Sequence, residues 1–108
     1  MSINKPLQDE SRAAIKCICQ RMISGEVSFV EGTRQVLDCA ENARLEQDDA
    51  DLIVFVGVAS ETDEVPGQEQ LKIWNKIAAA KNAAKWAELE RWARDYGSTA
   101  CRNFVSRF

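Results

Sequence analysis

Residues 51 to 67 read DLIVFVGVASETDEVPG, and this stretch decides the fold because its apolar part fits either a strand or a helix. The Ile and Val residues of 52–58 favour a strand, but short apolar runs also occur as buried helix. A lone strand leaves its backbone groups unpaired, and the chain has no second run of β-branched residues to pair with it. Asp48, Asp49 and Asp51 offer N-caps and favourable charge for a helix. We therefore predict a buried central helix, with a strand over 52–58 as the open alternative.

Helical patterns precede this stretch. Apolar residues recur there at spacings of three and four, which places them on one face of a helix. The first predicted helix begins near Pro6 and ends at Ser24-Gly25, with Ile15, Ile18, Cys19 and Met22 on its apolar face. The second begins at a capping box of Ser28 and Glu31, with Phe29, Val36, Ala40, Ala43 and the neighbouring Leu37 on its apolar side.

Two more helices are predicted after Pro66-Gly67. One runs from Gln68 to Ala80, with Leu71, Trp74, Ile77 and Ala78 on one face. A long terminal helix follows, capped by Asn82 and continuing through Gly97, with an apolar stripe of Trp86, Leu89, Ala93, Tyr96, Ala100 and Phe104. The sequence thus predicts an all-α fold, in which residues 1–108 form a single-domain bundle of about five helices.

The composition is that of one soluble domain. The chain has 108 residues, of which 45% are hydrophobic and 29% are charged, and this length supports a single core. No apolar run approaches the roughly 18–20 residues that span a bilayer, and the N-terminus lacks the apolar segment of a secretion signal. We expect a cytoplasmic protein with no membrane partner.

The net charge of −3 is distributed unevenly along the chain. Residues 41–69 contain nine acidic residues and one basic residue, whereas residues 70–108 contain eight basic and three acidic residues. The basic helices are expected to be solvated surfaces and no nucleic-acid partner is predicted, because the tryptophans are spaced for packing and the total charge is negative. The acidic middle is the more distinctive surface.

Several kinds of chemistry lack the residues they need. The chain has no histidine, which removes the commonest general base and the usual partner of a nucleophilic serine or cysteine. The four cysteines lack zinc-site spacing and are expected to be reduced and packed. The glycines are scattered, and residues 48–51 lack the central glycine and distal glutamate of a calcium loop. We expect no enzymatic activity, no metal and no cofactor.

The acidic residues around the central segment are the predicted binding site. If residues 52–59 belong to the core, the loop that follows is held on a fixed backbone, and such preorganisation favours binding of a basic partner. A charged loop that serves only solubility is the alternative. The predicted partner-binding residues are Asp48, Asp49, Asp51, Glu61, Asp63 and Glu64.

Three segments carry a resemblance to known proteins. They are GEVSFVEG at 25–32, FVGVASETDEVP at 55–66 and ACRNF at 100–104. With these segments the chain resembles a group of small bacterial proteins, some of which look like immunity proteins encoded beside polymorphic or contact-dependent growth-inhibition toxins. The resemblance implies a small cytosolic protein that binds and neutralises one toxin, often a nuclease.

The leading hypothesis is therefore a non-catalytic immunity protein whose acidic surface masks the basic active-site cleft of a toxin such as an RNase or another nuclease. The alternative is a small helical adaptor or a regulatory subunit of a cytosolic complex. An enzyme, the third class, requires a polar cleft that the sequence does not reveal.

Overall fold

The structure, a computed structural model, describes residues 5–108, and every regular element in that range is a helix. The elements are α1 (Lys5–Ser24), α2 (Phe29–Ala40), α3 (Ala50–Glu61), α4 (Gln68–Leu71) and α5 (Lys76–Arg107). The predicted all-α bundle is confirmed. Residues 52–58 lie within α3, so the helical interpretation of that segment is correct and the strand alternative is wrong.

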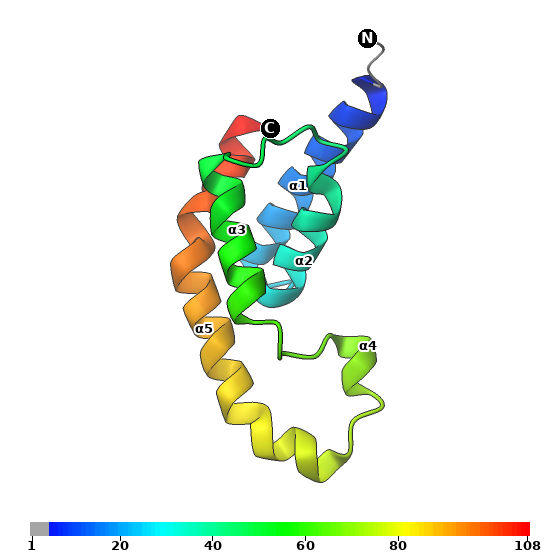
Figure 1. The fold of residues 1–108 in the computed structure, drawn as a ribbon, viewed down its shortest axis with the longest axis vertical. Helices are drawn as coiled ribbons and strands as arrows, with labels where there is room; N and C mark the ends of the chain where they lie inside the picture. The colour runs from blue at the N-terminus through cyan, green and yellow to red at the C-terminus, as the bar shows by residue number, and fades with distance from the viewer. Residues whose placement is uncertain (1–4) are drawn as a thin grey trace.

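The molecule is elongated, measuring 53 × 26 × 24 Å (Figure 1). Helix α5 has 32 residues and runs along most of the long axis, while α1, α2 and α3 pack against its C-terminal part. Its N-terminal part projects beyond the bundle, and the short α4 stands beside it, apart from the other helices. We call residues 68–85 the arm.

A single apolar core joins the four long helices. Three phenylalanines stack through its centre, with ring centroids 6.5 Å apart for Phe29 and Phe55 and 5.4 Å apart for Phe55 and Phe104. The buried apolar residues are Ile15, Cys19, Met22, Phe29, Val30, Val36, Ala43, Leu52, Phe55, Val58, Ala93, Ala100, Cys101 and Phe104. Because these come from α1, α2, α3, α5 and the turn after α2, the bundle forms one packed unit.

The N-terminus of α2 is capped from two directions. Ser28 Oγ accepts a hydrogen bond from the backbone N–H of Glu31 at 3.0 Å, which confirms the serine half of the predicted capping box. The N–H groups of Phe29 and Val30 donate to the carboxylate of Glu90 on α5, at 2.6 and 3.0 Å. A side chain 60 residues away in sequence therefore completes the cap and ties α2 to α5.

The predicted fourth helix from Gln68 to Ala80 is wrong. Helix α4 ends at Leu71, and α5 begins at Lys76 with Asn75 as its N-cap, accepting from Ile77 N at 2.8 Å. Asn82, the predicted cap, lies inside α5 and donates to a backbone carbonyl. The apolar residues of this segment have no packed helix to bury against, so the cap sets the boundary instead of the stripe.

The stripe predicted for the terminal helix holds at Ala93, Ala100 and Phe104 but not at Tyr96, which is 52% exposed. Gly97 occupies the buried position in its place. Both residues fit the helical repeat, since Gly97 follows Ala93 by four residues and precedes Ala100 by three. A residue without a side chain fits at the buried position because the ring of Phe29 fills the space that a side chain would need.

The four cysteines are free thiols, but only two belong to the core. Cys19 and Cys101 are fully buried, and the Cys101 thiol donates to the backbone carbonyl of Cys19 at 3.3 Å. A hydrogen bond between the side chains of Cys19 and Cys101, together with burial, raises the pKa of the Cys19 thiol, which keeps it protonated. Cys39 is half-buried and Cys17 is exposed, so the expectation that all four are packed fails at Cys17.

Candidate partner-binding site

The six acidic residues predicted to bind a partner lie at opposite ends of α3. Asp48, Asp49 and Asp51 surround its first residue, Ala50; Glu61 is its last residue, and Asp63 and Glu64 follow it. A helix of 12 residues is about 18 Å long, so the two groups do not form one continuous acidic patch. Each end has a different environment.

At the N-terminal end, two of the three carboxylates have structural partners. Asp49 caps α3 by accepting from the N–H groups of Asp51 and Leu52, at 3.0 and 3.2 Å. Arg107, near the C-terminus of α5, donates to Asp49 at 2.6 Å and to Asp51 at 3.0 Å. The side chains of Asp49 and Asp51 are only 11% and 16% exposed. These residues hold α5 to α3, which leaves Asp48 as the exposed acid of the group.

We expect the ion pairs of Arg107 with Asp49 and Asp51 to make the stability of the fold depend on pH. The hydrogen bond from Arg107 holds the pKa of Asp49 below its ordinary value of 3.8, although burial opposes the shift. A carboxyl group whose pKa is lower in the folded state stabilises the fold above its unfolded pKa, and that contribution is lost as pH falls through the folded value. Asp49→Asn should cost about 1 kcal/mol of unfolding free energy at neutral pH. The cost should shrink as pH falls through the folded-state pKa of Asp49 and vanish once the carboxyl group is protonated, as measured by urea unfolding at several pH values. A cost independent of pH would contradict the role of the ion pair.

At the C-terminal end, residues 61–64 form a turn that we call the acidic turn. Arg34 of α2 donates to the carbonyl oxygens of Thr62 and Val65, at 3.1 and 2.7 Å. The buried hydroxyl of Thr62 donates to the carbonyl of Val58, one turn back in α3, at 2.7 Å. The backbone of the acidic turn is therefore fixed from both sides, as the sequence predicted for a loop that follows a core element.

The carboxylates of the acidic turn point outward from this fixed backbone. Glu64 pairs with Lys85 of the arm at 3.0 Å. Glu61 and Asp63 are exposed, and within residues 5–108 neither has an ion-pair partner. These two side chains are therefore accessible to a partner.

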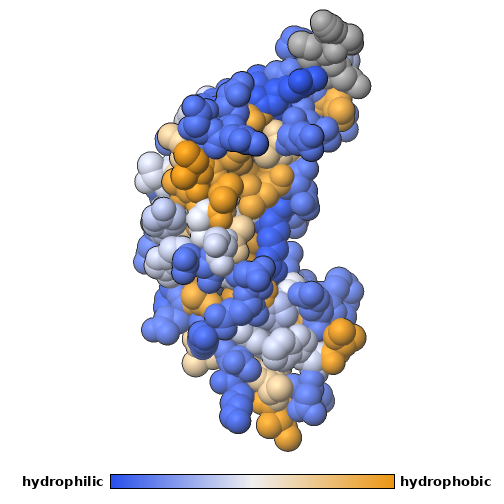
Figure 2. Space-filling model, in the orientation of Figure 1, coloured by the Kyte–Doolittle hydropathy of each residue, from blue (hydrophilic) through white to orange (hydrophobic). Residues whose placement is uncertain are grey.

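An apolar surface adjoins the acidic turn along α3. Ile53 and Val56 are each 52% exposed. On α5, Trp92 and Tyr96 stack with 5.2 Å between their ring centroids, and both line a hollow with Gly57, the residue that follows Val56. Figure 2 shows apolar surface gathered over the upper part of α3. We call Ile53, Val56, Trp92 and Tyr96 the α3–α5 face. Large exposed apolar side chains that lie together are typical of interaction surfaces.

A hollow of about 330 Å³ connects this face to the acidic turn. It is lined by Gly57, Ser60 and Glu61 of α3 and by Trp92 and Tyr96 of α5. We call it the aromatic hollow. It brings one predicted residue, Glu61, together with four that the sequence analysis did not select.

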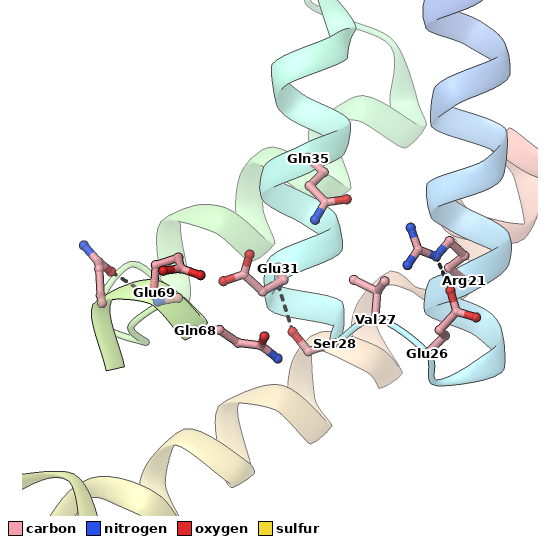
Figure 3. Close-up of a pocket in the computed structure, with 10 residues that line it drawn as sticks. Arg21, Glu26, Val27, Ser28, Glu31, Gln35, Gln68 and Glu69 are labelled. Atoms are coloured by element: carbon pink, nitrogen blue, oxygen red, sulfur yellow. Dashed lines mark hydrogen bonds and ion pairs between the residues drawn. The ribbon is translucent and has the colours of Figure 1, made fainter. Parts of the chain in front are cut away.

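A second, polar hollow of about 450 Å³ lies between the start of α2 and α4 (Figure 3). Three carboxylates reach it, and each has a basic neighbour: Glu26 is paired with Arg21, Glu31 lies 3.9 Å from Arg34, and Glu69 lies 3.2 Å from Lys72. Because its charges are already paired, this hollow is a weaker candidate for a charged partner. In the described part of the chain, no three cysteine or acidic side chains are placed to hold a metal ion together.

The tip of the arm carries another exposed apolar group. Ile73 and Ile77 are 86% and 78% exposed, and Leu71 is 41% exposed. Trp74 and Trp86 stabilise the arm internally, with an edge-to-face contact at 5.1 Å. The tip lies at the far end of the long axis from the start of α1 and the end of α5 (Figure 1).

Comparison with known proteins adds no relative, since no protein-family model, curated protein or solved structure matches the chain. Among residues 5–108, no helix has both the length and the apolar character required to cross a membrane.

The predicted binding residues are all acidic and do not include the apolar part of the site. Residues 52–58 are apolar on every side of the helix, and one such side stays exposed when Leu52, Phe55 and Val58 face the core. Ile53, Val56 and Ser60 lie on this exposed side, but the neighbouring residues are equally apolar, so the spacing does not distinguish it from the buried side. Trp92 and Tyr96, four residues apart, mark the matching face of α5.

Proposed function

We propose that the chain is a non-catalytic binding protein that neutralises a protein toxin by covering a basic surface of that toxin. The observation that carries this proposal is the position of the acidic turn, fixed by Arg34, at the edge of the α3–α5 face. An apolar centre with aromatic residues and a charged rim is the usual anatomy of a protein–protein interface. The resemblance to immunity proteins supports a toxin as the partner.

A nuclease toxin suits the charge of this surface. Enzymes that bind nucleic acid carry basic clefts that neutralise phosphates, and a fixed acidic turn competes for the same cleft. The fixed backbone lowers the ordering cost of binding. Glu61 and Asp63 supply the charge, and the α3–α5 face supplies the apolar contact area.

Charge reversal at the acidic turn tests this proposal. The variant Glu61→Lys/Asp63→Lys should bind the product of the adjacent reading frame with an association rate at least about tenfold lower at low salt, because electrostatic attraction becomes repulsion. The variant should also protect growing cells less well, because its association with the toxin is slower. Its melting curve should change little, because both side chains are exposed. Stopped-flow association at several salt concentrations and a growth assay with that product are the measurements.

A matched control lies at the other end of α3. Glu46→Lys/Asp48→Lys makes the same change in net charge at two exposed acids. At physiological ionic strength, where the Debye length of about 8 Å is shorter than α3, it should alter the association rate by less than about twofold. Equal losses in both variants would show that only total charge matters. Failure of the adjacent product to bind the unmodified chain would overturn the neutralisation proposal itself.

An adaptor is the second candidate, and the tip of the arm favours it. Ile73 and Ile77 form an apolar group separate from the α3–α5 face, and two separated apolar groups suit a protein that joins two partners. A ternary complex that survives size-exclusion chromatography would favour the adaptor. A strictly binary complex would favour neutralisation.

A further inference from the structure

The aromatic hollow has the composition of a site for one cationic side chain. Its volume of about 330 Å³ is at the lower end of the range for small-molecule sites, so it suits a single side chain better than a large ligand. Glu61 is its one charged lining residue, and Ser60 adds a hydroxyl group. A negative charge beside aromatic rings favours a cation and disfavours an anion.

The two aromatic rings of the hollow are available for a cation. Trp92 and Tyr96 stack nearly parallel, at an interplanar angle of 10°, and both remain partly exposed. In the described part of the chain, arginines lie over the rings of Phe29, Phe104 and Phe108, at 5.0 to 5.5 Å. No internal cation lies over Trp92 or Tyr96 in that part. Arginines of the chain thus lie over three phenylalanine rings, whereas among the described residues none lies over the Trp92–Tyr96 pair.

Arginine fits the hollow better than lysine. The guanidinium group is planar and weakly hydrated, so it stacks on aromatic faces, and its fork of donors can bind a carboxylate through two hydrogen bonds. The carboxylate of Glu61 has no ion-pair partner among residues 5–108 and can serve as that acceptor. The ammonium group of lysine is strongly hydrated and lacks the plane needed for stacking.

The absence of a side chain at Gly57 keeps the hollow open. A Cβ atom at this position would lie 3.7 Å from Cε2 and 3.8 Å from the hydroxyl of Tyr96, which are ordinary contact distances. Alanine therefore fits the fold, and its methyl group would occupy part of the hollow. Alanine also favours the helix more than glycine does, so this change separates binding from stability.

We propose that the aromatic hollow receives an arginine side chain of the protein partner, with the guanidinium group against Trp92 and Tyr96 and hydrogen-bonded to Glu61. This inference rests on the proposed function, which it deepens by naming the group on the partner that is recognised. The arginine acts as an anchor of the contact, because arginine, tryptophan and tyrosine residues commonly dominate the binding energy of protein–protein interfaces.

A peptide titration tests the site without the partner. The probe is acetyl-Gly-Arg-Gly-amide, compared with the same peptide containing citrulline, which has nearly the same shape but no charge. The reporter is the indole N–H signal of Trp92 in two-dimensional NMR, assigned with a Trp92→Phe variant. We expect a saturable shift with the arginine peptide and binding at least about tenfold weaker with citrulline. Equal shifts with both peptides would overturn the proposal.

Two variants and a control test whether the arginine peptide binds in the aromatic hollow and whether binding requires the charge of Glu61. Gly57→Ala should weaken binding of the arginine peptide by at least about fivefold while leaving the melting temperature unchanged or higher. Glu61→Gln should weaken it by a similar factor, because the amide has lost the charge. Glu46→Gln makes the same change in net charge at an exposed residue before the start of α3 and outside the hollow, and should change binding by less than about twofold. Unaltered binding in Gly57→Ala would place the peptide elsewhere.

The outcome for the hollow can be separated from the outcome for the proposed function. If the adjacent gene product binds the unmodified chain but the arginine peptide does not, the hollow is excluded and neutralisation stands. If the peptide binds and the gene product does not, the hollow stands and neutralisation is excluded.

Discussion

Replacing Glu90 with alanine should lower the free energy of unfolding by about 2 kcal/mol. The Glu90 carboxylate accepts hydrogen bonds from the N–H groups of Phe29 and Val30, whose residues are 0% and 2% exposed. Loss of an ordinary N-cap costs about 1 kcal/mol, and hydrogen bonds to a charged group contribute about 1.5–3 kcal/mol. Water can enter the space left by the side chain, so we expect a value between these limits.

Urea unfolding of three variants separates the cap from general effects of charge. Glu90→Gln keeps one acceptor oxygen and should lose about half as much stability as Glu90→Ala. Glu88→Ala removes an exposed carboxylate from the same helix and should stay within about 0.5 kcal/mol of the unmodified chain. If Glu90→Ala were as stable as Glu88→Ala, the bond between α5 and the start of α2 would have no energetic weight.

The central segment shows how far local sequence determines this fold. Its strand propensity is outweighed because the described chain offers no partner strand, and because Asp49 caps the first turn of α3. Both arguments are available from the sequence, so the helix was predictable. The exposed side was not, because a helix that is apolar all round gives no periodic signal for which residues face the core.

The binding surface was only partly predictable for a related reason. Acidic composition identified both ends of α3, but it did not reveal that Arg107 clamps Asp49 and Asp51, more than 50 residues away in sequence. Nor did it reveal that Trp92 and Tyr96 lie beside Glu61. Long-range pairings of this kind depend on how the helices pack against one another. The composition and spacing of residues along a sequence do not reveal that packing.

In the arm, the apolar periodicity did not predict the helix boundaries correctly. A regular stripe between Gln68 and Ala80 predicted one helix, yet the chain turns between Leu71 and Lys76. An amphipathic pattern stabilises a helix mainly through the surface it packs against. The arm has no such surface, so the capping side chain of Asn75 determines where α5 begins.

Gly97→Ala should destabilise the fold by about 2 kcal/mol, although alanine is the better helix former by about 1 kcal/mol. A Cβ atom at Gly97 would lie 2.5 Å from Cε1 of the Phe29 ring. That ring is fully buried, lies against Phe55, and belongs to a residue whose N–H is held by Glu90, so it has little freedom to move. Overpacking a core costs about 1–3 kcal/mol, and this rigid contact falls at or above the upper end of that range.

Gly57→Ala is the matched comparison for this substitution. Both glycines lie inside helices, but a Cβ atom at Gly57 meets only ordinary contacts with Tyr96. The same substitution should therefore stabilise the fold by up to about 1 kcal/mol at Gly57 and destabilise it at Gly97, a difference of about 3 kcal/mol. Urea unfolding of the two variants measures this difference. Equal stabilisation of both would mean that the Phe29 ring can move aside, and that Gly97 is not required by the packing of α5 against α2.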